Sequence, residues 1–370
     1  MATDTRGLYV HIPFCQRKCN YCDFCSFKLD TVHWREGYIN RLCEEIASYR
    51  DKRPSIDTIF FGGGTPSLLT PDELRRICSE ISLSFDIQPD TEFTVEANPK
   101  TLSGDKLATF VQCGVNRLSM GLQSIHENEL KILGRIHNYD DFLKSYRLAQ
   151  EFGIDNINVD LMFGIPEQTA ESFGRTLAEV IGLSPRHISL YGLILEEGTP
   201  LFENRNGLSF PSEDEECDMY YLAASKLASF GYSHYEISNY AKAGYECRHN
   251  LKYWRNEEYI GVGFGAHSYY EGKRFSNTYD VKEYLEGNCT KYICEEPTDE
   301  EYEFVMLRLR LREGFSLSEY KRRFGKDFPD GRQDCLNRLS RLGYIRLSRD
   351  RLSLTERGFY VSNSILTELI

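Results

Sequence analysis

Short apolar runs alternate with amphipathic stretches through the first half of the chain. The runs predict strands at 8–12, 57–64, 92–99, 117–124, 156–166 and 187–195. Apolar residues at helical spacing predict helices between them, at 70–81, 104–114, 140–153 and 170–182. Thr70 and Glu73 form an expected capping box at the start of the first of these helices. Repeated strand–helix units of this kind indicate a parallel sheet.

The number of units predicts the architecture. Six strands follow one another, and no Gly-x-Gly-x-x-Gly comes after the first, which favours a barrel or an open partial barrel over a Rossmann fold. From about residue 297 the pattern changes to three helices and a small hairpin, an order typical of a winged helix. We therefore expect a barrel domain at 1–240, a connecting segment at 241–296 and a C-terminal domain at 297–370.

Composition limits the partners and the compartment. The 370 residues carry a formal net charge of −12, so the chain has no overall electrostatic footprint for nucleic acid. The first residues lack the basic stretch and apolar run of a signal peptide, and no apolar run is long enough to cross a membrane. A cytoplasmic protein is expected, so its twelve cysteines should be reduced thiols.

Four cysteines stand close together near the start of the chain. Cys15, Cys19 and Cys22 are spaced C-x3-C-x2-C, and Cys25 follows. One short loop with these thiols could hold zinc through all four, or an iron–sulfur cube through three or four. Four ligands in one loop connect few distant parts of the chain, which favours the cluster over a structural zinc ion. A cube with three thiolates leaves one iron open for chemistry, so we interpret Cys25 as a thiol that does not bind the metal.

Polar residues follow the strands at the edge where barrel enzymes place their sites. A glycine turn, Gly62 to Gly64, ends the second strand, and Glu96, Gln123 and Asp160 end the next three. Glycine allows a ligand to approach the backbone, and the side chains can form charge-assisted hydrogen bonds. Each residue alone could equally be a strand-end cap or a buried polar group; their convergence on one edge predicts a binding site.

The cysteine spacing, with "YVHIPFC" before it, resembles the radical S-adenosylmethionine (SAM) superfamily. That resemblance implies a [4Fe–4S] cluster on Cys15, Cys19 and Cys22, whose open iron chelates SAM. The cluster then cleaves SAM with one electron. Carried over by position, the SAM contacts of the family fall on Tyr9, Gly63, Gly64, Thr65, Glu96, Gln123, Arg135 and Asp160, with a less secure contact near Gly192 or Ala266.

Further motifs, among them "FFGGGTPSLL", "GVNRLSMGLQS", "LGRIH" and "NINVDLMFGIPEQT", resemble the group of oxygen-independent coproporphyrinogen III oxidases and their relatives, closest to its HemW branch of heme chaperones. Two features separate the chain from the oxidases. Phe24 stands where they carry an additional cysteine, and their arm before the cluster is longer than the fourteen residues that precede Cys15. Cys25 departs from the usual chaperone pattern.

The segment "ECRHNLKYW" at 246–254 resembles the heme motif of the chaperones. The resemblance implies that His249 is an axial heme ligand, with Tyr253 and Trp254 as an aromatic wall. Cys247 is a competing ligand, and from the residues alone His249 could simply pack within a loop. His267, in a glycine-rich stretch, is equally ambiguous.

The sequence thus predicts a radical SAM partial barrel of the TIM type with a winged-helix-like C-terminal domain, acting as a heme chaperone. Its expected cofactors are a [4Fe–4S] cluster, SAM and heme, and its partners a heme-accepting apoprotein and a one-electron donor, with no nucleic acid. Peripheral association with a membrane stays open, and no catalytic residue is assigned. The alternatives are a radical SAM enzyme that oxidises coproporphyrinogen or another tetrapyrrole, and a zinc-stapled binding module.

Overall fold

The computed structural model describes residues 5–287, 292–293 and 299–370. Its centre is a sheet of six parallel strands in the order of the chain: β1 (Arg6–Ile12), β4 (Ser55–Gly63), β5 (Asp86–Ala97), β6 (Arg117–Gln123), β7 (Ile157–Phe163) and β8 (His187–Gly192). All six correspond to predicted strands. They are buried along most of their length, as expected of parallel strands that are covered on both faces.

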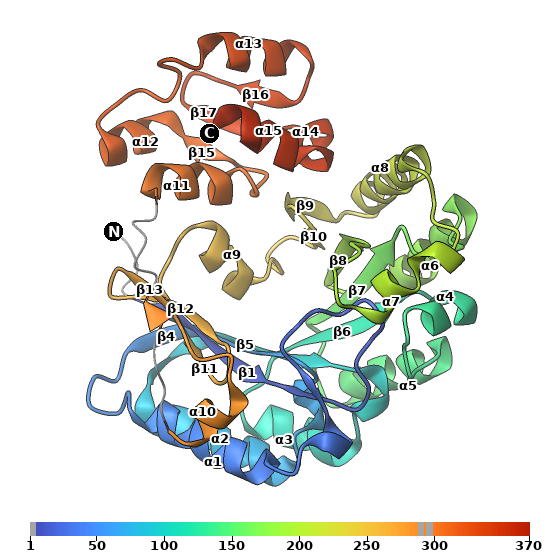
Figure 1. Ribbon diagram of the computed structural model, residues 1–370, viewed down its shortest axis with the longest axis vertical. Helices are drawn as coiled ribbons and strands as arrows, with labels where there is room; N and C mark the ends of the chain where they lie inside the picture. The colour runs from blue at the N-terminus through green and yellow to red at the C-terminus, as the bar shows by residue number, and fades with distance from the viewer. Residues whose placement is uncertain (1–4, 288–291, 294–298) are drawn as a thin grey trace.

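Helices cover the outer, convex face of this sheet (Figure 1). They are α1 (Arg35–Ala47), α2 (Pro71–Ser84), α3 (Gly104–Gln112), α5 (Tyr139–Glu151), α6 (Ala170–Leu183) and α8 (Glu213–Ser229). The predicted capping box is confirmed: Thr70 accepts from the Glu73 N–H, and the Glu73 carboxylate accepts from the Thr70 N–H. Several helices were not predicted: α1, α8 and the short helices α4 (Glu127–Ile132), α7 (Pro200–Glu203) and α10 (Val281–Leu285).

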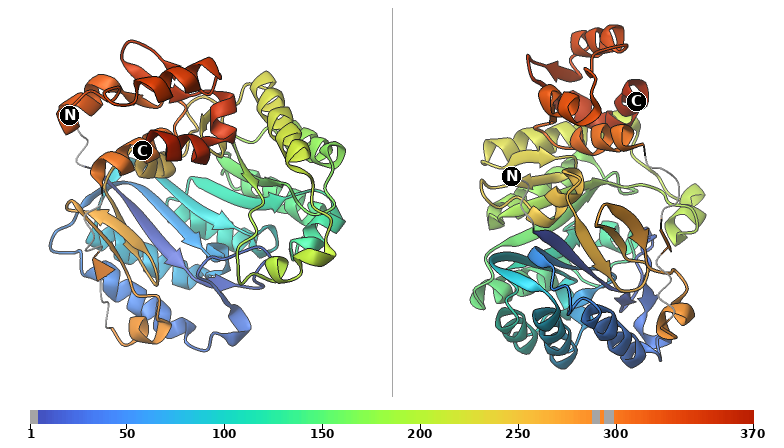
Figure 2. Two further views of the ribbon diagram at one scale, coloured as in Figure 1. Left: turned by 45° about the horizontal axis from the view of Figure 1, so that its top comes forward. Right: turned by 90° about the vertical axis from the view of Figure 1, so that its left-hand side faces the viewer.

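Additional strands extend the sheet at both edges without closing it. Beyond β1 lie β11 (Tyr259–Val262), which is parallel to β1, and then β12 (His267–Tyr270), β13 (Lys273–Ser276) and β14 (Tyr292–Ile293), which are antiparallel. Beyond β8 lies β10 (Asn239–Ala241), which is antiparallel to β8, and then β9 (Ser233–Glu236), which is antiparallel to β10. The result is an open, curved half-barrel, visible from two sides in Figure 2.

Helix α9 (Arg248–Trp254) lies on the concave side of the sheet, opposite the outer helices (Figure 1). This helix carries most of the predicted heme motif. It packs against β4, and its residues reach the inward-facing side chains of the central strands. The motif therefore forms part of the interior of the half-barrel.

The C-terminal unit has the three predicted helices and the hairpin in the predicted order, together with a short strand and two final helices that were not predicted. It contains α11 (Glu300–Arg308), β15 (Phe315–Ser316), α12 (Leu317–Phe324), α13 (Gln333–Arg341), β16 (Ile345–Leu347), β17 (Arg351–Leu354), α14 (Glu356–Tyr360) and α15 (Ser362–Leu369). A bridge between Glu236 and Leu311 joins this unit to β9 of the barrel. The expected boundary near residue 297, with Cys289 and Cys294, lies outside the described residues.

Candidate functional site

The cysteine loop is closed at its base and fixed at its tip. Strand β2 (Phe14–Cys15) pairs with β3 (Phe27–Lys28), so the residues between them form a loop with a narrow neck. At the tip, the Asn20 side chain donates to the Ile132 carbonyl and its N–H to the Leu133 carbonyl, both at 2.9 Å. The Asn20 carbonyl accepts from the Leu201 N–H at 2.8 Å. The loop is thus attached to the end of α4 and to α7.

Three of the four loop cysteines face one cavity. Cys15, Cys19 and Cys22 line it, whereas Cys25 does not. All four thiols are free of disulfides. Thr65 donates a hydrogen bond to the Cys15 sulfur at 3.8 Å, and the Arg135 guanidinium donates one to the Cys19 sulfur at 3.3 Å. The sequence pattern alone gave no indication that Arg135 would contact a cysteine.

The thiols suit a group that supplies positive charge. Burial raises the pKa of Cys15, and it raises the pKa of Cys22 to about 11, so neither is a thiolate at neutral pH on its own. Within the described part of the chain, no three Cys, His, Asp or Glu side chains converge to hold a single metal ion. Three thiols that face one cavity are a ligand set that an iron–sulfur cluster can use.

The cavity also contains the eight residues that the resemblance assigns to SAM by position. Its volume is about 440 Å³. The predicted residues that line it, beside the three cysteines, are Tyr9, Gly63, Gly64, Thr65, Glu96, Gln123, Arg135, Asp160 and His249. They come from β1, β4 with the turn that follows it, β5, β6, β7, the segment before α5, and α9. Gly192 and Ala266, the less secure pair, are not among its lining residues.

The cavity contains ionisable side chains of both signs, two carboxyl groups and two guanidinium groups. Burial and the nearby Asp160 carboxylate raise the pKa of Glu96 to about 8, and burial raises the pKa of Asp160 as well. Arg117 and Arg135 supply buried guanidinium groups at the same cavity. The Gln123 amide oxygen and the Nε atoms of both arginines are buried without a partner in the described chain. A ligand with both a cationic and an anionic end would match this set of groups.

The glycine turn packs closely against neighbouring segments of the chain. In the structure Gly63 has φ +106°, and a β-carbon there would lie 2.5 Å from the His11 ring. At Gly64 a β-carbon would lie 2.7 Å from the Phe14 carbonyl oxygen. The two glycines therefore allow the turn to pack against β1 and the cysteine loop.

His249 lies in the wall of the cavity, with both ring nitrogens engaged. Nδ1 is 2.9 Å from the Thr58 hydroxyl, Nε2 is 2.8 Å from the Tyr253 hydroxyl, and the ring stacks on Phe60. Only 1% of the residue is exposed, and burial lowers its pKa to about 3, so the imidazole is neutral. A heme iron could reach either nitrogen only after one of these hydrogen bonds is broken.

The amino end of α9 is held by a carboxylate from the sheet. Glu92, in β5, accepts hydrogen bonds from the N–H groups of Arg248 and His249, each at 3.1 Å. The Cys247 thiol donates to the same carboxylate at 3.6 Å, and burial raises the pKa of this thiol to about 12. Because heme iron takes a thiolate, Cys247 is a poor competitor of His249 at neutral pH.

A buried polar network beside the cavity was missed from the sequence. His187 lies 2.6 Å from the Asn158 amide oxygen and 2.8 Å from the Tyr235 hydroxyl, which accepts from the Cys247 N–H at 3.1 Å. Arg117, Asn158 and His187 all line the cavity. A signal was available in the sequence: Arg117, Asn158 and His187 are polar residues within otherwise apolar strands. They lie near the amino-terminal ends of these strands, whereas the prediction considered only the carboxyl ends.

The comparisons with known proteins agree with this architecture. Residues 9–180 match the Radical SAM superfamily and residues 296–361 the HemN C-terminal domain. The chain is 36% identical to the heme chaperone HemW of Bacillus subtilis, over 97% of this chain and 98% of that protein. It is also 36% identical to HemW of Lactococcus lactis, over 100% and 98%. Among solved structures it resembles coproporphyrinogen III oxidase (HemN) from Escherichia coli, with a TM-score of 0.85 at 23% identity, covering 99% of this chain and 90% of that one.

Together, the half-barrel and these matches define a radical SAM α/β fold, as predicted. The oxidase structure is too distant in sequence to carry more than this fold. The full-length identities to the chaperones go further: the chain belongs to the HemW family of heme chaperones. None of the helices described for it combines the length and apolarity that crossing a membrane requires.

Proposed function

We propose that this protein binds heme and passes it to an acceptor apoprotein, and that it carries a [4Fe–4S] cluster and SAM in the cavity of the half-barrel. The observation that carries the cofactor part is the convergence of three cysteines and eight further predicted residues on one cavity. The heme part is supported by membership of a family whose relatives are named heme chaperones.

The residues of the cavity have distinct tasks in this proposal. Cys15, Cys19 and Cys22 would hold the cluster, and Arg135 would offset the negative charge of its thiolates. Glu96 and Asp160 would hold the cationic part of SAM, because a positive charge beside them favours their ionised forms. When bound, the cluster and SAM supply one-electron chemistry.

For heme, we propose that His249 is the ligand in a state in which α9 has opened. The neutral imidazole has the correct protonation state for iron. Opening α9 would have to break the contacts of His249 with Thr58 and Phe60 of β4, whereas its contact with Tyr253 lies within α9. The hydrogen bonds from α9 to Glu92 would resist that movement.

The test is a heme titration of the anaerobically reconstituted protein, followed by visible and electron paramagnetic resonance (EPR) spectra. His249→Ala should abolish the imidazole signature, while His267→Ala, an exposed histidine on β12, serves as the matched control. Transfer is then measured by mixing the heme-loaded protein with a heme-free b-type cytochrome. Unchanged heme spectra in His249→Ala would remove the ligand assignment.

The same preparation tests the rival function. The protein is incubated with coproporphyrinogen III, SAM and a reductant under anaerobic conditions. We expect no protoporphyrinogen, because Phe24 occupies the place of the additional oxidase cysteine and is 64% exposed at the rim of the cavity. Its formation would establish the oxidase in place of the chaperone.

A further inference from the structure

Three cations on and beside the cysteine loop are not among the residues assigned to SAM, although one of them, Arg17, also lines the SAM cavity. Arg17 and Lys18 lie on the loop itself, and Lys131 lies in the last turn of α4, beside the loop. All three residues are exposed. In the part of the chain that the structure describes, none of them forms an ion pair; Lys18 donates to the Phe24 carbonyl at 3.0 Å. Their charges are therefore available to a partner.

A hollow of about 650 Å³ lies between Arg17, α4 and the segment before α5. Its cations are Arg17, Lys100, Lys131 and Arg135. The acidic residues that face it are Glu127 and Asp141. Asp141 is 3.3 Å from Lys100 and also caps α5, so its charge is already engaged. The hollow is thus positive, on a chain whose net charge is −12.

Two side chains connect this hollow with the SAM cavity. Arg17 and Arg135 line both, and the Arg135 guanidinium lies 3.3 Å from the Cys19 sulfur. His137, which is 4% exposed, lines the hollow with a buried Nδ1 that has no partner among the described residues. A partner seated in the hollow would be one side chain away from a cysteine sulfur.

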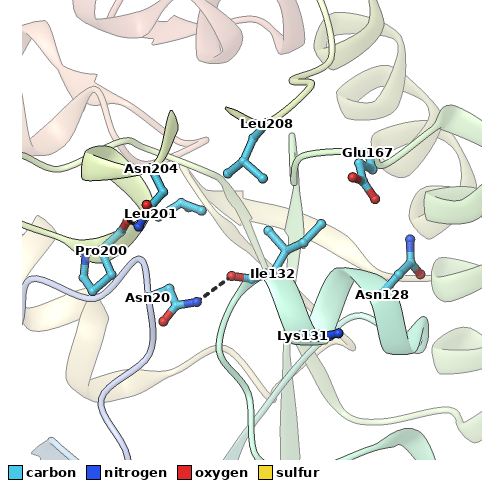
Figure 3. Close-up of a pocket in the computed structure, with 9 residues that line it drawn as sticks. All are labelled: Asn20, Asn128, Lys131, Ile132, Glu167, Pro200, Leu201, Asn204 and Leu208. Atoms are coloured by element: carbon cyan, nitrogen blue, oxygen red, sulfur yellow. Dashed lines mark hydrogen bonds between the residues drawn. The ribbon is translucent and has the colours of Figure 1, made fainter. Parts of the chain in front are cut away.

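A second hollow, of about 430 Å³, also borders Lys131 (Figure 3), and its charged lining residues are Lys131 and Glu167. Asn20 of the cysteine loop lines it, and the figure shows the hydrogen bond from Asn20 to the Ile132 carbonyl. Lys131 therefore lines two depressions that both border the cysteine loop. We call the surface formed by Arg17, Lys18, Lys131 and these two hollows the loop face.

We propose that the loop face docks an acidic protein that carries single electrons, and that electrons enter the cluster here. This inference rests on the proposed function, since it requires the cluster on Cys15, Cys19 and Cys22. An acidic carrier is repelled by the chain as a whole, so a local group of unpaired cations would select this face and speed the encounter. In the transfer the carrier loses one electron and the cluster passes from the 2+ to the 1+ state, with no bond formed or broken.

The test compares two variants with the same change in net charge. The first carries Arg17→Gln, Lys18→Gln and Lys131→Gln. The control carries Arg322→Gln, Arg341→Gln and Arg346→Gln, three exposed cations of the C-terminal unit. The binding of oxidised flavodoxin, an acidic flavin carrier, is measured by calorimetry at low and high salt. Reduction of the cluster by flavodoxin hydroquinone is followed by stopped-flow absorbance, with titanium(III) citrate as a small reductant for reference.

At low salt, we expect the loop-face variant to bind flavodoxin at least about tenfold more weakly than the wild type. Its cluster should also be reduced by flavodoxin at least about tenfold more slowly. Both differences should shrink as salt screens the charges. The control variant should match the wild type, and titanium(III) should reduce all three equally. Equal binding and equal rates in the two variants would overturn the inference. If the triple change lowered the iron content, Lys131→Glu alone would decide, and an undiminished rate would overturn the proposal.

The two proposals fail in different ways. A protein without iron and sulfide, or one whose cluster titanium(III) cannot reduce, would contradict the proposed function. A protein with a reducible cluster that takes electrons from flavodoxin regardless of the loop face would contradict the inference alone.

Discussion

Glu96 should release a proton when SAM binds. Its pKa of about 8 arises from burial and from the nearby Asp160 carboxylate, so at pH 7 only roughly a tenth of the molecules carry the ionised form. A cationic ligand beside the carboxylate favours ionisation. Binding at pH 7 should therefore release about 0.9 proton from this group.

The energetic consequence has a definite sign. Ionising Glu96 at pH 7 costs about 1.4 kcal/mol, since pH 7 lies about one unit below its pKa. SAM affinity should therefore rise about tenfold per pH unit below pH 8 and level off above it. A protonated Glu96 at low pH offers no negative charge to the ligand, which is why affinity falls with decreasing pH.

Calorimetry in two buffers of different ionisation enthalpy measures the released protons directly. The control is Glu96→Gln, which keeps the shape of the side chain and cannot ionise. In this variant the proton release and most of the pH dependence should disappear, while iron and sulfide content stays the same. Wild-type binding without proton exchange between pH 6 and 8 would refute the assignment of Glu96 to the ligand.

Three other outcomes are expected. Cys19→Ala should lose the iron and sulfide of the cluster and its visible absorbance, whereas Cys25→Ala should keep them; an equal loss would refute the three-cysteine site. Gly134→Ala should also lower cluster content, because φ at Gly134 is +73° and a β-carbon would lie 2.7 Å from the Asn20 side chain; full iron content would show that the loop does not need this anchor. Acidification should destabilise the fold, because His249 has a pKa of about 3 when folded and near 6.5 when unfolded. Its stabilising contribution is complete above pH 6.5 and falls by about 1.4 kcal/mol per pH unit below it; urea unfolding at pH 7 and pH 5 should show a smaller loss in His249→Gln.

Much of the barrel could be predicted because its signals are local. Apolar runs and helical spacing identified the six central strands and four of the outer helices, and the carboxyl ends of parallel strands necessarily meet at one edge. For this reason Glu96, Gln123 and Asp160, far apart in the chain, were correctly expected to lie together.

The remainder depends on contacts between distant segments. His249 and Thr58 are 191 residues apart, and no local pattern indicates that α9 enters the half-barrel. The pairing of β11 with β1 likewise joins segments from the two ends of the barrel. The extra strands are only two to four residues long, too short for alternation to be distinguished from a loop.

The position of α9 has a thermodynamic consequence. His249 stacks on Phe60, which stacks on Tyr9, so the helix and the cavity share one wall. A ligand that fills the cavity and a ligand that requires α9 to open both act on the equilibrium between the closed and open positions of α9. Their binding free energies are then coupled, and the coupling is reciprocal: the factor by which SAM changes the affinity for heme equals the factor by which heme changes the affinity for SAM.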